Sequence, residues 1–359
     1  MARDVGASPA TAAMSDGARS RPRARYLPIA EHGLIGDLHT VALVGTDATI
    51  DWYCCPRFDA PSVFAAILDA DRGGAFRISP DYDGWSSKQL YLPDTNVLIT
   101  RFLMPDGVGE VQDFMPPAST GESAHRHRMI RRVLAVRGEM RFLVEVAPRF
   151  DYARARHDVA RTPHGARFRS PVLELSLSTP CPLEIVDGDV RARVALRAGE
   201  SADFVLERVE PGELPARYSD ADITAAFDAT VAFWRRWLRR SRYCGRWRET
   251  VNRSALALKL LTYAPTGAIV AAPTTSLPEV LGGARNWDYR YTWMRDSAFT
   301  LYALLRLGFT EEAGAFMNWL EGRVRHAADR ECGPLQIMYG IDGREDLPEE
   351  ELSDRKSVV

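Results

Sequence analysis

The residues between positions 285 and 296 combine side chains of the types that bind sugars. They read RNWDYRYTWMRD, with four aromatic side chains, three arginines and two aspartates. An amphipathic helix would separate apolar from charged residues on two faces, whereas this segment interleaves them. Aromatic rings stack on the C–H groups of a sugar, while arginine and aspartate bind its hydroxyls. The segment is interpreted either as a sugar-binding loop or as a structural loop held by aromatic packing and an Arg–Asp ion pair.

The chain before this segment has the pattern of an antiparallel β-sandwich. From about residue 34 to residue 210, apolar residues alternate with polar ones and short turns interrupt them, which is typical of strands with one buried face. The expected strand pairs are 40–44 with 49–53, 97–102 with 111–114, 129–136 with 141–146, and 183–186 with 190–196.

The pattern changes to a helical one after Ser219. Between residues 221 and 241 the apolar residues recur at steps of three and four, which predicts a helix with one buried face. Further helices are expected at 247–263, from about Asp296, and after Thr310. The expected organisation is a disordered leader over 1–25, a sandwich domain over 26–218 and a helical domain over 219–359.

The composition excludes several classes of protein. The 359 residues include 46 basic and 48 acidic ones, a net charge of −2, and 46% are hydrophobic, which is typical of a soluble globular protein. No apolar run approaches the roughly 20 residues that span a bilayer, and none forms a secretory signal. We therefore expect a cytoplasmic protein with no membrane partner. Four arginines between 235 and 240 are interpreted as a solvated helix face, not as a nucleic-acid-binding surface.

Neither a metal nor a cofactor is expected from the sequence. The five cysteines have no CxxC spacing, and no glycine-rich phosphate loop opens a helix. His125 and His127 are two residues apart and could face one side of a strand, but no third metal ligand is visible near them.

Four separated blocks, one of them an N-terminal block in two stretches, resemble glycoside hydrolase family fifteen, which contains glucoamylases, glucodextranases and certain bacterial trehalases. Residues 285–296 resemble the first signature of its catalytic domain. The stretches IAEHGLIGD at 29–37 and TIDW at 49–52 are similar to the non-catalytic sandwich of trehalase-like members. The blocks APTTSLPE at 272–279 and LQIMYGIDG at 335–343 also match. The resemblance covers residues 26–352 approximately.

The resemblance implies a fold, a substrate class and a set of binding residues. The implied fold is an N-terminal antiparallel β-supersandwich followed by an (α/α)6 barrel. The implied reaction is inverting hydrolysis of a terminal α-glucosidic bond, in trehalose or at the end of an α-glucan, with water as the only co-reactant. By resemblance, Trp293, Arg295 and Asp296 hold the non-reducing glucose. Arg285, Trp287 and Asp288 belong to the same matched motif.

The catalytic residues implied by the family have no match in this sequence. Inversion needs two carboxyl groups, roughly 6.5–9.5 Å apart, and no segment matches the motif around either family glutamate. Glu349, Glu350 and Glu351 are interpreted as the solvated start of a helix. Residues 353–359 look unlike the continuation of the family, so we expect an incomplete barrel in a C-terminally truncated member that lacks hydrolase activity. The alternative to a hydrolase of this family is a non-catalytic, truncated remnant with at most weak glucose binding.

Overall fold

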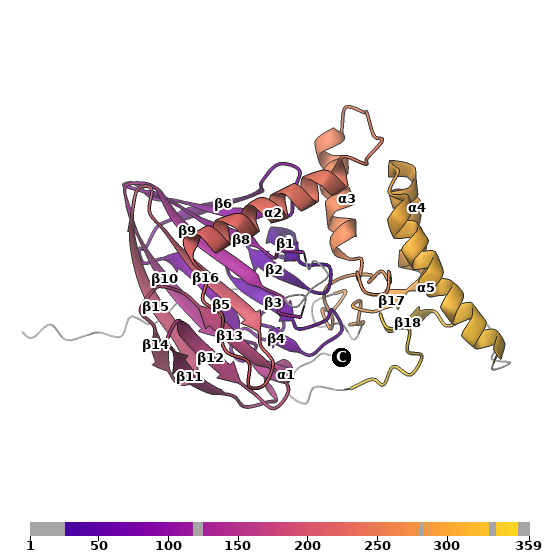
Figure 1. Cartoon of the computed structure of the whole chain (residues 1–359), viewed down its shortest axis with the longest axis horizontal. Helices are drawn as coiled ribbons and strands as arrows, with labels where there is room; N and C mark the ends of the chain where they lie inside the picture. The colour runs from indigo at the N-terminus through magenta and orange to yellow at the C-terminus, as the bar shows by residue number, and fades with distance from the viewer. Residues whose placement is uncertain (1–25, 118–124, 281–282, 284, 330–334, 351–359) are drawn as a thin grey trace, which may run out of the picture.

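Two antiparallel β-sheets form the first part of the structure, and helices follow them (Figure 1). The computed structural model describes residues 26–117, 125–280, 283, 285–329 and 335–350. The predicted leader over 1–25 and the predicted tail over 353–359 lie outside the described residues. So does Glu351, while Glu349 and Glu350 are exposed as expected but are not helical.

Each of the two sheets contains eight strands. The first has the order β1-β2-β3-β5-β10-β15-β14, with β4 beside β3, and the second has the order β11-β12-β13-β16-β9-β8-β7-β6. The first sheet consists of β1 (His32–Gly36), β2 (Val41–Gly45), β3 (Ile50–Cys54), β4 (Ser62–Phe64), β5 (Ala75–Pro80), β10 (Glu139–Ala147), β14 (Glu184–Val186) and β15 (Asp189–Arg197). The second consists of β6 (Ser86–Tyr91), β7 (Leu98–Leu103), β8 (Val108–Phe114), β9 (Met129–Arg137), β11 (Asp158–Thr162), β12 (Gly165–Arg169), β13 (Glu174–Ser178) and β16 (Ser201–Arg208). The short helical turns are η1 (Ile29–Glu31) and α1 (Phe150–Ala153).

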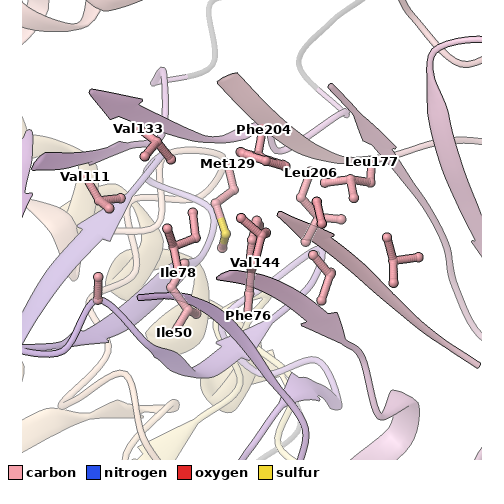
Figure 2. Packing of buried hydrophobic residues seen from close by; sticks show 14 of the residues in the cluster. Ile50, Phe76, Ile78, Val111, Met129, Val133, Val144, Leu177, Phe204 and Leu206 are labelled. Carbon is pink, nitrogen blue, oxygen red and sulfur yellow. The ribbon is translucent and has the colours of Figure 1, made fainter. Parts of the chain in front are cut away.

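The sandwich core lies between the two sheets. Figure 2 shows Phe76 and Val144 from the first sheet gathered with Met129 and Phe204 from the second. These side chains are 3% exposed or less, so the alternating apolar pattern has a direct physical cause. Each strand turns every second side chain toward the other sheet.

A buried arginine joins the two sheets within this core. Arg131 on β9 is fully buried, and its Nε donates to Oδ1 of Asp113 on β8 at 2.7 Å. Its two terminal nitrogens cross to the first sheet. They donate to the carbonyl oxygens of Phe76, at 2.6 Å, and Ala48, at 2.5 Å. A buried charge is tolerated only where it is paired and its donors are satisfied, and both conditions hold here.

Three of the four predicted strand pairs are confirmed, and the fourth is wrong. The pairs β2–β3, β7–β8 and β14–β15 form as expected. The predicted pairing of 129–136 with 141–146 does not form, because β9 belongs to the second sheet and β10 to the first. Gly138, with φ of 71°, carries the chain between the sheets. A Cβ there would lie 2.1 Å from the carbonyl oxygen of Asp106. Alternation cannot distinguish strands that face each other across a core from strands that pair.

The four predicted helices are confirmed. They are α2 (Asp220–Leu238), α3 (Arg248–Leu260), α4 (Met294–Leu307) and α5 (Thr310–Asp329), and a two-stranded sheet of β17 (Thr292–Trp293) and β18 (Met338–Tyr339) accompanies them. Ser219 and Asp222 form a capping box at the start of α2, which satisfies amide groups that would otherwise lack partners. Every helix in the described part of the chain is too short or too polar to cross a lipid bilayer.

Helix α2 connects the sandwich with the other helices. Near its beginning, Ile223 packs on Phe114, Ile130 and Val205, which lie on the outer face of the second sheet, and Figure 1 shows α2 lying across β8 and β9. Near its end, Trp237 packs in a second cluster, and its ring stacks on Phe309 at a centroid distance of 4.0 Å. One helix therefore packs on both parts of the structure.

A buried carboxylate, that of Glu312 on α5, holds three helical segments together. It accepts a hydrogen bond from Nε1 of Trp237 on α2 at 2.6 Å. It also pairs with Nζ of Lys259 on α3 at 3.0 Å and with Nη2 of Arg240, just after α2, at 2.8 Å. Burial alone would raise the pKa of Glu312, but Lys259 and Trp237 outweigh it, and the pKa is lowered.

We predict that Glu312→Gln lowers the free energy of unfolding of the helical part by about 2 kcal/mol, since it removes charge-assisted bonds from a buried cluster. Because folding lowers the pKa of Glu312, its contribution is complete above the ordinary value of 4.5 and disappears as the pH falls below it. Urea unfolding followed by helical circular dichroism at pH 7 and pH 3.5 measures both effects. Glu321→Gln, which alters an exposed pair with Arg325 on the same helix, is the control and changes stability by less than about 0.5 kcal/mol. Equal losses in the two variants would contradict the prediction.

Candidate functional site

The segment 285–291 lies beside residues 271–279, so two of the sequence blocks singled out above are neighbours in space. Main-chain hydrogen bonds of 2.9–3.3 Å join them, donated by Ala271 to Tyr291, Ala272 to Tyr289, Tyr289 to Thr274, Ser276 to Trp287, and Glu279 to Arg285. These hydrogen bonds are made by the main chains of the two stretches. The side chains of the segment 285–291 therefore determine which other groups it contacts.

The third block, at 335–343, pairs with the end of the segment. Thr292 and Trp293 on β17 pair with Tyr339 and Met338 on β18. The amide of Met294 also donates to the carbonyl oxygen of Ile337 at 3.0 Å. Helix α4 begins immediately after this short sheet, and β17 therefore fixes where the helix starts.

The same third block is ion-paired with the sandwich. Asp342 contacts Arg57, in the connection between β3 and β4, at 3.0 Å. Arg344 reaches Asp59 in that connection at 2.9 Å, and its Nη2 lies 3.3 Å from the hydroxyl of Tyr291. The pKa of Asp342 is lowered, because the backbone amide of Arg344 and the guanidinium of Arg57 outweigh the effect of its burial. These charged pairs link the segment to the first sheet.

Arg290 anchors the segment directly in the sandwich. Its side chain is 1% exposed, and it binds both oxygens of Asp288, with Nη2 donating to Oδ2 at 2.6 Å. Nη1 donates to the carbonyl oxygen of Ala60 at 2.8 Å and approaches Sγ of Cys54 at 3.5 Å. Burial opposes the charge of Arg290, but Asp288 outweighs it and the pKa of the guanidinium is raised. Burial also raises the pKa of the Cys54 thiol to about 11, so this thiol is neutral near pH 7.

Trp52 makes a second direct link between the sandwich and the site. It lies on β3, is fully buried, and its Nε1 donates to the carbonyl oxygen of Pro273 at 2.6 Å. Pro273 belongs to the block that pairs with 285–291. The TIDW stretch of the sandwich, which contains Trp52, therefore contacts the block at 272–279.

Trp293, Arg295 and Asp296 lie together at the beginning of α4. Asp296 lies in the first turn of the helix, and Arg295 binds its Oδ2 through Nη2 at 2.9 Å. The guanidinium of Arg295 also lies 5.7 Å from the ring centre of Trp293, whose Nε1 donates to the carbonyl oxygen of Asp288 at 3.0 Å. The side chains of Arg295 and Asp296 are 65% and 33% exposed. An aromatic ring, a donor fork and an acceptor are thus adjacent and accessible.

The other three predicted site residues have different environments. Asp288 is occupied by Arg290 and is only 10% exposed. Arg285 is largely exposed, and its nearest carboxylate is that of Glu279, 3.9 Å away. Trp287 is about half exposed. The structure therefore brings Trp293, Arg295 and Asp296 into contact with one another, and places Arg285 and Trp287 further along the same segment.

The anchoring function of Arg290 was missed by reasoning from the sequence. A signal was present, because Asp288 and Arg290 are two residues apart in a segment with no helical periodicity. In an extended chain such residues share one face and form an ion pair. The sequence could not show the second partner of Arg290, because the carbonyl oxygen of Ala60 is 230 residues away along the chain.

Comparison with known proteins gives matches over both parts of the chain. Residues 245–357 match the family described as glycosyl hydrolases family 15, and residues 23–207 match the trehalase-like N-terminal family. A trehalase of Mycolicibacterium smegmatis is 37% identical over 351 residues, which are 91% of this chain and 52% of that protein. A trehalase of Thermoplasma acidophilum is 36% identical over 314 residues, which are 86% of this chain and 52% of that protein.

A solved structure shows the same fold. A bacterial glucoamylase in complex with acarbose superimposes with a TM-score of 0.59 and 11% identity, over 87% of this chain and 52% of that chain. The chain spans about half the length of the curated relatives it matches. Because the matches cover both the sandwich and the segment that carries the candidate site, the chain belongs to the trehalase-like members of glycosyl hydrolase family 15.

Proposed function

We propose that this chain carries the sandwich and the glucose-binding part of a glycoside hydrolase that cleaves a terminal α-glucosidic bond, in trehalose or at an α-glucan end. The observation that carries the proposal is the accessible group of Trp293, Arg295 and Asp296, in a segment whose main chain is hydrogen-bonded to two other matched blocks, 272–279 and 335–343. The similarity to trehalases over both parts of the chain supports the substrate class.

In this proposal one glucose unit is held at the beginning of α4. The ring of Trp293 stacks on the C–H face of the sugar. Arg295 and Asp296 currently bind each other, and both are accessible. They can therefore exchange this contact for hydrogen bonds to neighbouring hydroxyls, the guanidinium donating and the carboxylate accepting. Arg285 and Trp287 provide a donor and an aromatic surface further along the segment.

Asp288 has a positioning function in this proposal. Its carboxylate holds Arg290, and its carbonyl oxygen accepts the hydrogen bond from Trp293. A change at Asp288 therefore affects both the anchor of the segment and the orientation of the aromatic ring. The sugar-binding group depends on this residue even without a direct contact.

The domain division and the barrel are part of the same proposal. We assign 26–218 to the sandwich domain and 219–359 to helices of an (α/α)6 barrel. The exposed surface of α4 and α5 supports this assignment. Phe299 and Tyr302 on α4 are 73% and 64% exposed, and Met317 on α5 is 54% exposed. Large apolar side chains this exposed are typical of a surface that packs on a neighbour.

Hydrolysis needs two catalytic carboxyl groups, and no segment of this sequence matches the family motifs that contain them. In an inverting reaction one carboxylic acid protonates the leaving oxygen, and one carboxylate removes a proton from the attacking water. Asp288 is paired with Arg290, and the sequence has no segment like the motif around either family glutamate. We infer that these 359 residues bind glucose without hydrolysing the bond.

We predict that Arg295→Ala weakens binding of glucose and of trehalose roughly 10- to 100-fold, the equivalent of about 1.5–3 kcal/mol for hydrogen bonds to a charged group. Isothermal titration calorimetry measures the dissociation constants. Arg306→Ala is the matched control, because Arg306 lies in the last turn of the same helix, away from the proposed site. This variant is expected to retain the affinity of the unaltered protein. An unchanged affinity in Arg295→Ala would exclude this residue from the sugar site.

Arg290→Lys is predicted to loosen the segment 285–291 and to weaken sugar binding indirectly. Lysine keeps the charge but cannot bind Asp288 through two nitrogens while reaching Ala60, so we expect a loss of about 2 kcal/mol of stability. Hydrogen exchange of the amides at 271–279 and 285–291 measures the loosening. Arg285→Lys, on the same segment but largely exposed, leaves the exchange rates unchanged. Equal protection in Arg290→Lys would show that Arg290 is not the anchor.

The purified chain is predicted to release no glucose from trehalose or maltose. A coupled glucose assay, compared with a mock preparation and with added commercial trehalase as a positive control, measures this. Release above the mock level that disappears in Arg295→Ala would overturn the inference that catalytic carboxyl groups are missing. It would leave the proposed binding site in place.

A further inference from the structure

A second group of polar side chains lies on the sandwich, apart from the proposed sugar-binding residues. Asp37 and His39 come from the turn between β1 and β2, and His127 lies two residues before β9. One ligand atom from each of the three residues lies within 4.8 Å of the others. This is the only such group among the described residues. It combines two imidazoles with one carboxylate.

Hydrogen bonds orient the members of this group. Oδ1 of Asp37 accepts from the backbone amides of His39 and Thr40, both at 2.9 Å. Its Oδ2 lies 2.8 Å from Nδ1 of His127, and the two imidazole rings are 5.2 Å apart between centres. The turn therefore fixes the carboxylate, and the carboxylate fixes one imidazole. Such preorganisation is what a metal site requires of its ligands.

The backbone is in an unfavourable conformation at both places that supply these residues. Leu38, between Asp37 and His39, has φ of 71°, and His127 itself has φ of 47°. A residue other than glycine rarely adopts this left-handed region, and such strain concentrates at ligand sites. The two strained positions are the ones that bring the imidazoles toward the carboxylate.

The surroundings favour a cation. Asp37 is 1% exposed and His127 is 7% exposed, while His39 is only partly buried and leaves a route from solvent. Burial alone would raise the pKa of Asp37, but the contacts with His127 and His39 outweigh it, and the pKa is lowered. The group whose ligand atoms lie within 4.8 Å of one another does not include the nearby Cys55.

We propose that Asp37, His39 and His127 bind one divalent transition-metal ion, with Zn²⁺ as the best fit and a water molecule as the fourth ligand. Two imidazole nitrogens and one carboxylate oxygen suit zinc, and this ligand set does not suit magnesium, which prefers oxygen ligands alone. Zinc–ligand bonds of about 2.0–2.2 Å in a tetrahedral site place the ligand atoms roughly 3.4 Å apart. Ligand atoms that are up to 4.8 Å apart here therefore move closer together, and the 2.8 Å hydrogen bond between Asp37 and His127 is replaced by bonds to the ion.

The position of the group indicates a structural effect of the ion. The carbonyl oxygen of Leu38 accepts from the amide of Ala264, just after α3, at 2.9 Å, and the ring of Tyr263 lies edge-on to His39 at 5.8 Å. An ion here would fix the turn at 37–40, on which the chain after α3 packs. Because it binds only the folded protein, it raises the unfolding temperature.

The experiment uses the full chain without a histidine tag, treated with EDTA and then dialysed. Titration calorimetry with Zn²⁺ is expected to give one ion per chain, and Co²⁺ is expected to give the visible absorption of a four-coordinate imidazole site. His39→Gln and His127→Gln each weaken binding at least about tenfold. His125→Gln is the control, since His125 lies on the same segment but faces Glu213 at 3.5 Å, and it retains the affinity.

Several results would overturn the proposal. They are the absence of saturable binding of one ion, equal binding in His39→Gln and the unaltered chain, and an unfolding temperature that Zn²⁺ does not change. Circular dichroism checks that each variant is folded. If His127→Gln does not fold, His39→Gln decides the outcome, because His39 is partly exposed. The sugar titration is a separate measurement, so a missing zinc site leaves the proposed function untouched.

Discussion

This structure depends on one type of interaction, which occurs twice. In each case a buried guanidinium pairs with one aspartate and donates to a main-chain carbonyl of a different part of the chain. Arg131 makes it between the two sheets, with Asp113, Phe76 and Ala48. Arg290 makes it between the sandwich and the loop before α4, with Asp288 and Ala60. In both places the aspartate offsets the charge of the guanidinium, and the remaining N–H groups of the guanidinium donate to carbonyl oxygens of the other part of the structure. A planar group with five donors can satisfy both demands, and an ammonium cannot.

The second of these arginines shows how the sandwich supports the segment that carries the proposed sugar site. Trp293, Arg295 and Asp296 are accessible and have few partners of their own. Their positions come from β17, from the hydrogen bonds to residues 271–279, and from the anchor at Arg290. The proposed binding group is thus supported from the first sheet outward, through main-chain hydrogen bonds and one buried arginine.

Much of the fold could be predicted from the sequence because its cause is local. Alternating residues and short turns identified three strand pairs, and steps of three and four identified α2. The pairing of β9 with β10 was wrong because alternation reports a buried face and not the neighbour that covers it. The anchoring of Arg290 was missed for a similar reason. The group of Asp37, His39 and His127 was hidden by a separation of 90 residues between Asp37 and His127.

The two hydrogen-bonded links that Trp52 and Arg290 make between the sandwich and the loop are chemically asymmetric. Trp52 and Arg290 donate through their side chains, whereas Pro273 and Ala60 accept through their peptide carbonyls. Every amino acid supplies the same carbonyl, so positions 60 and 273 can change identity while the hydrogen bond persists. Positions 52 and 290 have no such freedom. In a hybrid that joins the sandwich of one homologue to the helices of another, the residues to transplant with each half are therefore the two donors, and the acceptors come with the backbone.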